Sequence, residues 1–333
     1  MKLDFDPRKN MSMFAYCQAR VRNLNILNKL NDIVIAKGLL SNWYDAIFFR
    51  LGFKKSFFMH LRDGSIERIN NRNDYNKFWE SEKAIGSILE NRIKFKNKIN
   101  LDLKNKIIKV KTNWIGKEIK FRYDDGKQAI NTTDLIIETF VNEQYKNLDV
   151  KNKNVIDVGA NIGDSAIYFA LKGAKHVYAF EPYLYSYNLA KENIKLNGLD
   201  NIITLINEGC GKNGFVRIDS EIKNYGNNDL KNTKYGEKIV ITSINSIIKK
   251  FRIKDVVLKI DCEGCEYDTI YTLYQQSVIK YGIIEYHYGY KNLIRKLKIL
   301  GFEVSYNMPR FVYNAGAENK DMYVGWVRFK KDV

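Results

Sequence analysis

Residues 154–164 read Asn154-Val155-Ile156-Asp157-Val158-Gly159-Ala160-Asn161-Ile162-Gly163-Asp164, and this stretch decides the fold. A short apolar strand ends in an acid, a glycine-rich turn follows, and a helix opens at Asp164. Glycines in such a turn let the backbone approach a ligand closely, and the first turn of a helix offers N–H groups without partners inside the helix. The stretch therefore predicts a strand–turn–helix unit whose turn binds a ligand.

From Val155 onward, strands alternate with helices, which is typical of a parallel, doubly wound sheet. Seven strands are predicted, at residues 154–158, 176–181, 202–207, 256–261, 282–287, 302–306 and 322–329. The clearest intervening helices are predicted at 164–172, 184–197, 266–276 and 290–300. Two further strands, near 215–219 and 238–241, form a side excursion around a Gly/Asn-rich loop at 223–236.

The chain ahead of this pattern reads differently. Residues 1–98 are predicted to form a mainly helical appendage, with a helix over 13–37 and a hairpin around the Asp63-Gly64 turn. Residues 99–123 alternate in strand fashion, which predicts a small antiparallel meander that leads into a helix near 133–144. We therefore expect two domains, residues 1–98 and 99–333. The second joins the meander to a core of about 134–330.

The composition excludes several classes of protein. Hydrophobic residues make up 45% and charged residues 28%, which are ordinary values for a globular protein and exclude wholesale disorder. No uncharged apolar run approaches the roughly 18 residues that span a bilayer, and the first residues lack a signal-peptide core. Four cysteines make no disulfide framework. We expect a soluble protein of a reducing compartment, the cytoplasm.

The charge is strongly basic, with 55 Lys and Arg against 38 Asp and Glu, a formal net charge of +17. Such a balance often accompanies nucleic-acid binding, but the richness in Lys, Asn, Ile and Tyr also matches an AT-rich coding bias. The basic residues are densest from Arg92 to Lys120, where the sequence has ten of them and only two acids, Asp102 and Glu118. This basic segment (residues 92–120) is predicted to be a solvated strand face. Contact with an anionic glycan, lipid or nucleotide-linked substrate is the alternative.

An aromatic and basic segment lies in the first hundred residues, between Trp43 and Lys55. We expect its aromatic side chains to pack the appendage onto its neighbour. Peripheral contact with a membrane surface is the less favoured alternative.

The second predicted strand ends in Ala179-Phe180-Glu181-Pro182. A carboxylate at this point of an α/β sheet can accept hydrogen bonds from both hydroxyls of a ribose. Nicotinamide enzymes also place an acid there, but they use a G-x-G-x-x-G turn, and here Asn161 replaces the middle glycine. Glu181 therefore indicates a nucleoside ligand, while a nicotinamide oxidoreductase is disfavoured. A non-catalytic binding module is the least favoured class.

Several motifs together resemble class I S-adenosylmethionine-dependent methyltransferases: residues 157–163, Glu181-Pro182 and Asn193-Ile194-Lys195-Leu196-Asn197. The stretch Leu258-Lys259-Ile260-Asp261-Cys262-Glu263-Gly264-Cys265-Glu266 is similar to the K-I-D-x-E-G-x-E signature of the FkbM methyltransferase family, as are Tyr168-Phe169-Ala170 and Gly173-Ala174-Lys175. The resemblance covers about Glu138 to Phe302. It implies a Rossmann-like, seven-stranded mixed sheet and S-adenosylmethionine as the cofactor.

The resemblance also implies which residues contact that cofactor. The turn would line the methionine and the ribose, Glu181 would hold the ribose hydroxyls, and Asn207 and Glu208 would approach the adenine. The implied cofactor-binding set is Asp157, Gly159, Asn161, Gly163, Glu181, Asn207, Glu208 and Asp261.

The residues expected to carry the chemistry are His287, Asp261 and Glu263, with Glu285 as a further candidate base. Methyl transfer from a sulfonium is an in-line displacement, so placement supplies much of the catalysis. A neutral hydroxyl acceptor still needs a base. His287 closes the fifth predicted strand, where the ligand sites of open α/β sheets lie, and its pKa range suits proton transfer.

Cys262 and Cys265 form a C-x-x-C pair, a spacing that also occurs in redox and zinc sites. No second cysteine pair completes a zinc site, and the family that the chain resembles places small apolar residues here. The two cysteines are therefore predicted to act as small packing residues. No metal is assigned, and a divalent cation held by Asp261 and Glu263 is the less favoured alternative.

The expected function is methylation of a hydroxyl on a sugar, glycan or other small polar molecule, and an anionic acceptor would suit the basic segment. The hydroxyl acceptor is implied by the resemblance. The alternative is an RNA methyltransferase that uses the basic N-terminal region. It is disfavoured because no N-P-P-Y-type motif follows the fourth strand, and because the acids there repel phosphates. The sequence leaves the oligomeric state open.

Overall fold

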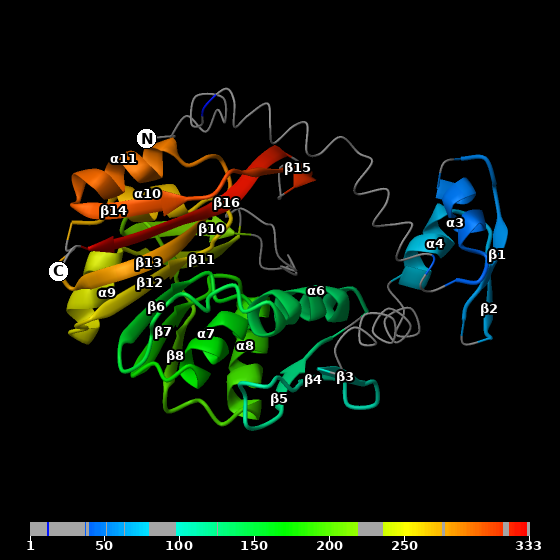
Figure 1. Cartoon of the computed structure of the whole chain (residues 1–333), viewed down its shortest axis with the longest axis horizontal. Coiled ribbons are helices and arrows are strands. Elements are labelled where there is room, and N and C mark those ends of the chain that lie inside the picture. The colour runs from blue at the N-terminus through cyan, green and yellow to red at the C-terminus, as the bar shows by residue number, and fades with distance from the viewer. Residues whose placement is uncertain are drawn as a thin grey trace. The chain divides into compact units, whose positions relative to one another are not determined.

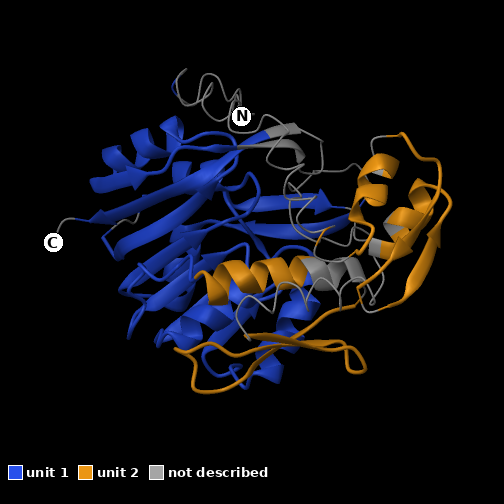
Figure 2. Ribbon diagram, turned by 45° about the vertical axis from the view of Figure 1, so that its right-hand side comes forward, with its two compact units in different colours: residues 1–23, 143–333 blue, residues 24–142 orange. Residues whose placement is uncertain are grey.

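The structure, a computed structural model, describes residues 12, 37, 40–50, 52–62, 64–79, 98–124, 126–218, 236–274, 277–315 and 320–331. Spatial proximity divides the chain into two compact units, residues 1–23 with 143–333 and residues 24–142 (Figure 2). Nearly all of the helix predicted over 13–37 and of the loop predicted at 223–236 lies outside the described residues.

The unit that contains residues 143–333 is built on a sheet whose main path runs β14-β16-β13-β12-β6-β7-β8 (Figure 1). The strands are β6 (Asn154–Val158), β7 (His176–Phe180), β8 (Ile203–Ile206), β12 (Val256–Ile260), β13 (Ile279–Tyr286), β14 (Phe302–Tyr306) and β16 (Lys320–Lys331). Strands β8, β7, β6, β12 and β13 pair in parallel, whereas β16 runs antiparallel to β13 and β14. The predicted seven-stranded mixed sheet is confirmed, and β15 (Arg310–Ala315) adds an eighth strand that pairs with β16.

The chain reverses its direction across this sheet between β6 and β12. From β6 it moves outward through α7 (Asp164–Leu171), β7, α8 (Leu184–Leu196) and β8. It then returns to β12 and moves the other way through α10 (Glu266–Tyr271), β13 and α11 (Lys291–Ile299). Because β–α–β crossovers are right-handed, the two halves place their helices on opposite faces. The carboxyl ends of β6 and β12 meet at this switch point, where open α/β sheets bind ligands.

Strands β6 and β12 form the centre of the sheet because their side chains are mostly apolar on both faces. All five residues of β12 are buried, and so are the last four of β6. Two of these buried residues are charged, Asp157 in β6 and Lys259 in β12. Their pairing is part of the candidate site.

The predicted side excursion is confirmed. Strand β10 (Gly214–Ile218) pairs antiparallel with β11 (Glu237–Thr242), which pairs in parallel with β9 (Gly209–Cys210). Helix α9 (Ile244–Phe251) follows, and the hydroxyl of Ser243 caps it by accepting the N–H of Ser246.

Helix α10 ends at Tyr271, whereas the sequence pattern predicts it to residue 276. The carbonyl of Thr272 accepts a hydrogen bond from the side-chain amide of Asn245, and the hydroxyl of Thr272 donates to backbone carbonyls of the preceding turn. These bonds satisfy carbonyls at the helix end that would otherwise need further helical turns.

In the unit of residues 24–142, β1 (Phe57–His60) and β2 (Ile66–Ile69) form the predicted hairpin. Helices α3 (Trp43–Arg50) and α4 (Arg72–Trp79) pack against it in one small core. The ring of Phe49 lies 5.3 Å from that of Phe57, measured between centroids. Phe48 and Phe53 of the same aromatic segment remain 45% and 76% exposed. Part of the segment therefore packs within its own unit.

The predicted meander is also confirmed: β3 (Ile99–Asp102), β4 (Ile107–Val110) and β5 (Ile119–Arg122) are antiparallel neighbours. The helix that follows is α6 (Gly126–Ile136), continued by the π-helical turn η1 (Ile137–Val141). It begins earlier than the predicted 133–144. Spatial proximity groups this meander with the hairpin, and the domain boundary predicted at residue 98 stays a prediction.

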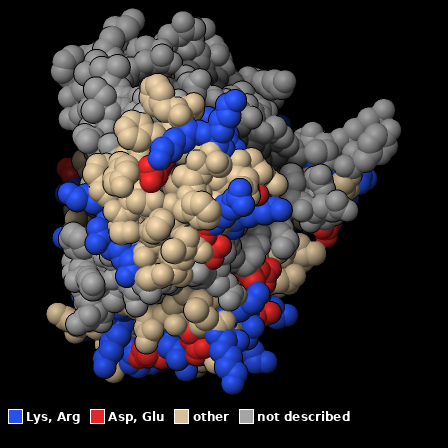
Figure 3. All heavy atoms as spheres, turned by 90° about the vertical axis from the view of Figure 1, so that its right-hand side faces the viewer, with Lys and Arg blue, Asp and Glu red and all other residues tan. Residues whose placement is uncertain are grey.

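None of the helices within the described residues is both long enough and apolar enough to cross a membrane. On the face drawn in Figure 3, Lys and Arg side chains are interspersed with Asp and Glu. Within the basic segment, Lys109 lies 3.2 Å from Asp102, and the Lys106 ammonium donates to the carbonyl of Asp124. Some of the basic charge is thus locally partnered.

Candidate functional site

The glycine turn after β6 lies directly against the end of β12. Gly159 has a φ of +77°, and a Cβ atom on it would lie 1.8 Å from the carbonyl oxygen of Asp261. The N–H of Asp261 donates to Val158, and the N–H groups of Gly159 and Ala160 both donate to the carbonyl of Phe180. Only glycine fits at position 159, because any side chain would collide with the backbone of β12.

A buried ion pair supports this turn. The ammonium of Lys259 lies 3.0 Å from Oδ1 of Asp157 and donates to the carbonyl of Gly159 at 2.7 Å. The hydroxyl of Ser165 donates to the other Asp157 oxygen at 2.6 Å. Burial by itself lowers the pKa of Lys259, but the neighbouring carboxylates, led by Asp157, outweigh it and raise the pKa. Lys259 is therefore charged, and it links Asp157 to the backbone of the turn. The predicted contact of Asp157 with the cofactor stays a prediction.

Glu181, at the end of β7, binds the same turn from the other side of β6. Its Oε2 accepts the N–H of Asn161 and its Oε1 accepts the N–H of Tyr183, both at 2.9 Å. Burial raises the pKa of Glu181 to about 7. Each carboxylate oxygen has a second lone pair, so the group keeps the capacity to accept ribose hydroxyls.

Asn161 supplies a polar atom that lacks a partner. Its Oδ1 is buried, and no donor among the described residues reaches it. Asn161 adopts a φ of +47°, in the left-handed region, between the two glycines of the turn. An unsatisfied buried acceptor costs about 1–3 kcal/mol. A ligand that brings an N–H donor would remove this penalty, as the amino group of S-adenosylmethionine would.

The two residues predicted to approach the adenine differ in their surroundings. Asn207, after β8, donates through Nδ2 to the carbonyls of Glu181 and Pro182 at 2.9 and 3.0 Å. Glu208 instead accepts the hydroxyl of Thr242, from β11, at 2.6 Å. The structure thus joins Asn207 to the Glu181 end of the site, whereas Glu208 is directed to the side excursion.

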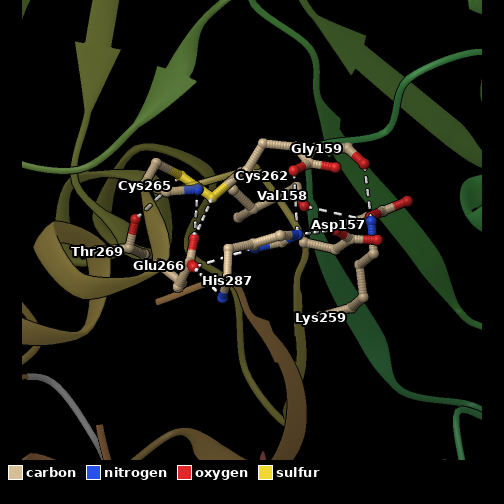
Figure 4. The surroundings of a disulfide bond; sticks show 12 residues. Asp157, Val158, Gly159, Lys259, Cys262, Cys265, Glu266, Thr269 and His287 are labelled. Atoms are coloured by element: carbon tan, nitrogen blue, oxygen red, sulfur yellow. Dashed lines mark hydrogen bonds and ion pairs between the residues drawn. A yellow bond between two sulfur atoms is a disulfide. The ribbon is translucent and has the colours of Figure 1, made fainter. Parts of the chain in front are cut away.

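The three residues predicted as catalytic come together at the ends of β12 and β13. Nε2 of His287 lies 3.2 Å from Oε2 of Glu263 and 4.0 Å from Oδ1 of Asp261. On the other side of the ring, Nδ1 lies 3.1 Å from Oε1 of Glu266, which also accepts the His287 backbone N–H at 3.0 Å (Figure 4). Glu266 is fully buried.

The carboxylates around His287 control its charge. Burial lowers the pKa of His287, but Glu263 and Glu266 outweigh that effect and raise the pKa well above its ordinary value. Burial also raises the pKa of Glu285 well above the usual range, and the charge of Asp261 adds to the shift. The surrounding carboxylates thus favour the protonated form of His287. Glu285 is thus a second candidate base beside His287, with a raised pKa.

Cys262 and Cys265 are joined by a disulfide bond (Figure 4). Both pack against the core of the larger unit, as predicted, but the disulfide between them was not predicted. Glu263 and Gly264, between them, have φ values of +54° and +124°, and this tight turn brings the two Cα atoms to 5.5 Å, within disulfide range. Disulfides of reducing compartments are usually transient or catalytic, so the expected cytoplasmic location stays a prediction.

The sequence reasoning left three functional side chains without a role: Lys259, Glu266 and Ser165. Lys259 and Glu266 belong to the quoted signature, and a lysine inside the otherwise apolar strand β12 was a signal for a buried ion pair. Ser165 had no such signal, because its bond to Asp157 depends on how helix α7 leaves the turn.

The strand order, the antiparallel β16, the glycine turn after β6 and the acid after β7 define the Rossmann-like fold of class I methyltransferases. Residues 157–304 match the family model described as the methyltransferase FkbM domain. The resemblance to the FkbM methyltransferase family that the motifs predicted is thus confirmed over residues 157–304.

Known proteins share shorter or more distant similarity with the chain. Protein arginine N-methyltransferase 1 of Oryza sativa subsp. indica is 48% identical over 56 residues, which are 17% of this chain and 14% of that protein. The chain thus matches only a small part of that relative's length. TrmK of M. capricolum, solved with S-adenosylhomocysteine, has 17% identity and a TM-score of 0.38, covering 58% of this chain and 68% of TrmK. Precorrin-6y C5,15-methyltransferase of Geobacter metallireducens GS-15 has 12% identity and a TM-score of 0.34. The match covers 62% of this chain and 86% of that protein.

Proposed function

We propose that the protein is an S-adenosylmethionine-dependent methyltransferase that methylates a hydroxyl of a sugar, glycan or other small polar molecule. The family match over residues 157–304 supports the reaction class. The observation that carries the proposal is the turn at the switch point, where Gly159 excludes any side chain and Asn161 presents an unpaired acceptor. The hydroxyl acceptor rests on the resemblance to the family.

The cofactor supplies a methyl group on a positively charged sulfur. In the proposed complex, Asn161 accepts a hydrogen bond from the amino group, Glu181 accepts the ribose hydroxyls, and Asn207 borders the adenine. Gly159 and Gly163 let the turn pack against Asp261 and Ala190, and the backbone of this turn is proposed to line the methionine part. Asp157 and Lys259 act through the turn, as positioning residues.

The acceptor is proposed to bind beside Asp261, Glu263 and His287. S-adenosylmethionine would supply the methyl group to the acceptor oxygen and would keep the electron pair of the carbon–sulfur bond on sulfur, and a nearby side chain would take up the hydroxyl proton. His287, the predicted base, can take this proton only in its neutral form, which the neighbouring carboxylates disfavour, and Glu285 is the alternative base. His287→Ala should reduce turnover strongly while leaving cofactor affinity intact. Unchanged turnover would show that His287 has no part in the chemistry.

An RNA acceptor remains the alternative, because the chain carries a net charge of +17. The acids at the ends of β12 and β13 oppose it, since they repel phosphates. A filter-binding titration with RNA tests it directly: phosphate contacts would give an affinity that falls steeply with salt. An RNA affinity that does not change with salt would favour the small polar acceptor.

Calorimetry with S-adenosylhomocysteine tests the cofactor site. We expect saturable binding of one molecule per chain, and a loss of at least about tenfold in Glu181→Ala, because hydrogen bonds to charged groups contribute about 1.5–3 kcal/mol. Glu303→Ala is the matched control, because Glu303 is a half-exposed acid paired with Lys330 on the far strands β14 and β16. No binding by the unaltered protein, or equal losses in both variants, would refute the proposed cofactor site.

A further inference from the structure

Asp261, Glu263 and His287 have the geometry of a cation site. One ligand atom from each, a carboxylate oxygen or a ring nitrogen, lies within 4.8 Å of the other two. Nε2 of His287 is 3.2 Å from Glu263 and 4.0 Å from Asp261. A transition-metal cation binds such atoms at about 2.0–2.2 Å, so ligands at right angles lie about 3 Å apart and opposite ligands about 4.3 Å apart. The observed distances fall in this range.

The histidine is oriented by a residue outside this trio. His287 is only 2% exposed, and its Nδ1 faces the fully buried carboxylate of Glu266 at 3.1 Å. Oε1 of Glu266 also accepts the His287 backbone N–H, and its Oε2 accepts the N–H of Gly264 at 2.8 Å. Histidines that ligate metals almost always donate the other ring N–H to such a carboxylate or carbonyl. This arrangement leaves Nε2 directed at Asp261 and Glu263.

A buried oxygen in the same place lacks a hydrogen bond. Oε2 of Glu263 is shielded from solvent, and no donor among the described residues reaches it with hydrogen-bond geometry. A cation would replace the proton on Nε2 that the carboxylates otherwise favour. With Nδ1 donating to Glu266, the neutral ring then presents Nε2 as an acceptor, and three acceptors converge on one point. A cation at that point would satisfy all three at once.

We propose that Asp261, Glu263 and His287 bind a divalent transition-metal cation. Mn²⁺ is the cation that their ligand atoms suit best. Two carboxylates suit Mg²⁺ and Mn²⁺, whereas the imidazole favours a transition metal, and Mn²⁺ accepts both. The neighbouring Cys262 and Cys265 offer no thiolate while they are joined to each other.

The cation would also have a function. Three protein ligands leave coordination positions open, as in catalytic metal sites. An acceptor hydroxyl bound there would be held at the switch point, and its pKa would be lowered by the cation. This role rests on the proposed function, whereas the binding site itself rests on the geometry of this chain.

The test is a Mn²⁺ titration of the full chain after treatment with a chelator, with free Mn²⁺ followed by electron paramagnetic resonance. We expect one Mn²⁺ per chain. In pulsed measurements, modulation from a directly bound imidazole nitrogen should appear, and His287→Gln should abolish it. Glu263→Gln should weaken binding at least tenfold. Glu303→Gln removes the same charge from a half-exposed acid on β14 and should leave binding unchanged.

Several outcomes would overturn the proposal: no saturable Mn²⁺ binding, equal affinity in Glu263→Gln and the unaltered protein, or a bound Mn²⁺ without nitrogen modulation. Asp261→Asn gives a second measurement if Glu263→Gln fails to fold. Because the titration uses neither methyl donor nor acceptor, it is independent of the proposed function. Binding of S-adenosylhomocysteine without binding of Mn²⁺ would refute the metal site alone. Binding of Mn²⁺ without binding of S-adenosylhomocysteine would refute the cofactor site alone.

Discussion

Substituting methionine for Lys259 would leave the carboxylate of Asp157 in the interior without its cation. The two groups lie 3.0 Å apart, and their side chains are 2% and 0% exposed. Ser165 would still donate one hydrogen bond to Asp157, but the carboxylate is fully buried, so its other oxygen would lose the ammonium without exposure to solvent. Breaking a buried ion pair by removing one partner costs roughly 3–5 kcal/mol. For a unit of this size, that corresponds to a fall in melting temperature on the order of 10 °C.

The same substitution acts on the candidate site. Lys259 donates to the carbonyl of Gly159 at 2.7 Å, so its loss also releases the turn that is proposed to hold the cofactor. We therefore expect Lys259→Met to lower both the melting temperature and the affinity for S-adenosylhomocysteine. The double variant Asp157→Leu/Lys259→Met should recover most of the stability, because replacing a whole buried pair by apolar residues is nearly neutral. It should not recover the affinity.

Thermal unfolding followed by circular dichroism, with calorimetry on the same samples, measures both effects. Lys330→Met is the matched control: Lys330 lies 2.8 Å from Glu303, but both side chains are at least half exposed. Surface pairs of this kind contribute about 0–1 kcal/mol. If Lys259→Met melts no earlier than Lys330→Met, or if the double variant is as unstable as the single one, the reasoning from the buried pair is refuted.

Three further predictions concern the turn, the ribose acid and the disulfide. Gly159→Ala should weaken S-adenosylhomocysteine binding by more than Gly198→Ala. Both glycines have a positive φ, but only at Gly159 would the added Cβ collide with a backbone atom. Equal losses in the two variants would mean that backbone strain alone, about 1–3 kcal/mol, explains the effect. Burial raises the pKa of Glu181 to about 7, above its unfolded value, so its contribution to stability is present below about pH 4.5 and is lost as the pH rises through about 7. Cofactor affinity should rise over the same window, since ribose hydroxyls bind the ionised form, and Glu181→Gln should flatten both curves in melting and calorimetry; unchanged curves would contradict this. Reduction, or Cys262→Ser/Cys265→Ser, should lower the unfolding free energy by about 2 kcal/mol at most, because the disulfide closes a very short loop; a loss far above that in denaturant titrations would contradict the loop-entropy reasoning.

Much of the larger unit could be predicted because its signals are local. An apolar run that ends in Asp157 and a glycine turn specifies a strand and the helix after it, and β6 begins and ends where the sequence pattern places it. The parallel order of the sheet followed from the alternation of strands and helices. Helix α10 was predicted too long because Asn245, which binds the carbonyl of Thr272, lies 27 residues earlier in the chain.

The candidate site could also be predicted only in part. Position at the end of a strand was enough to select Glu181, Asp261, Glu263 and His287, since the carboxyl ends of parallel strands share one edge of a sheet. The disulfide escaped prediction because it depends on a turn with positive φ at Glu263, a conformation that non-glycine residues seldom adopt.

The local sequence was therefore sufficient for the resemblance to the FkbM family, for the fold and for the identity of the polar residues at the switch point. The partner of each charge was decided by the folded chain alone. Glu266 reaches His287 across 21 positions and Lys259 reaches the carbonyl of Gly159 across 100, so neither contact leaves a mark in local periodicity. These contacts set which groups are protonated, because the pKa of a buried group depends on the charges that surround it in space.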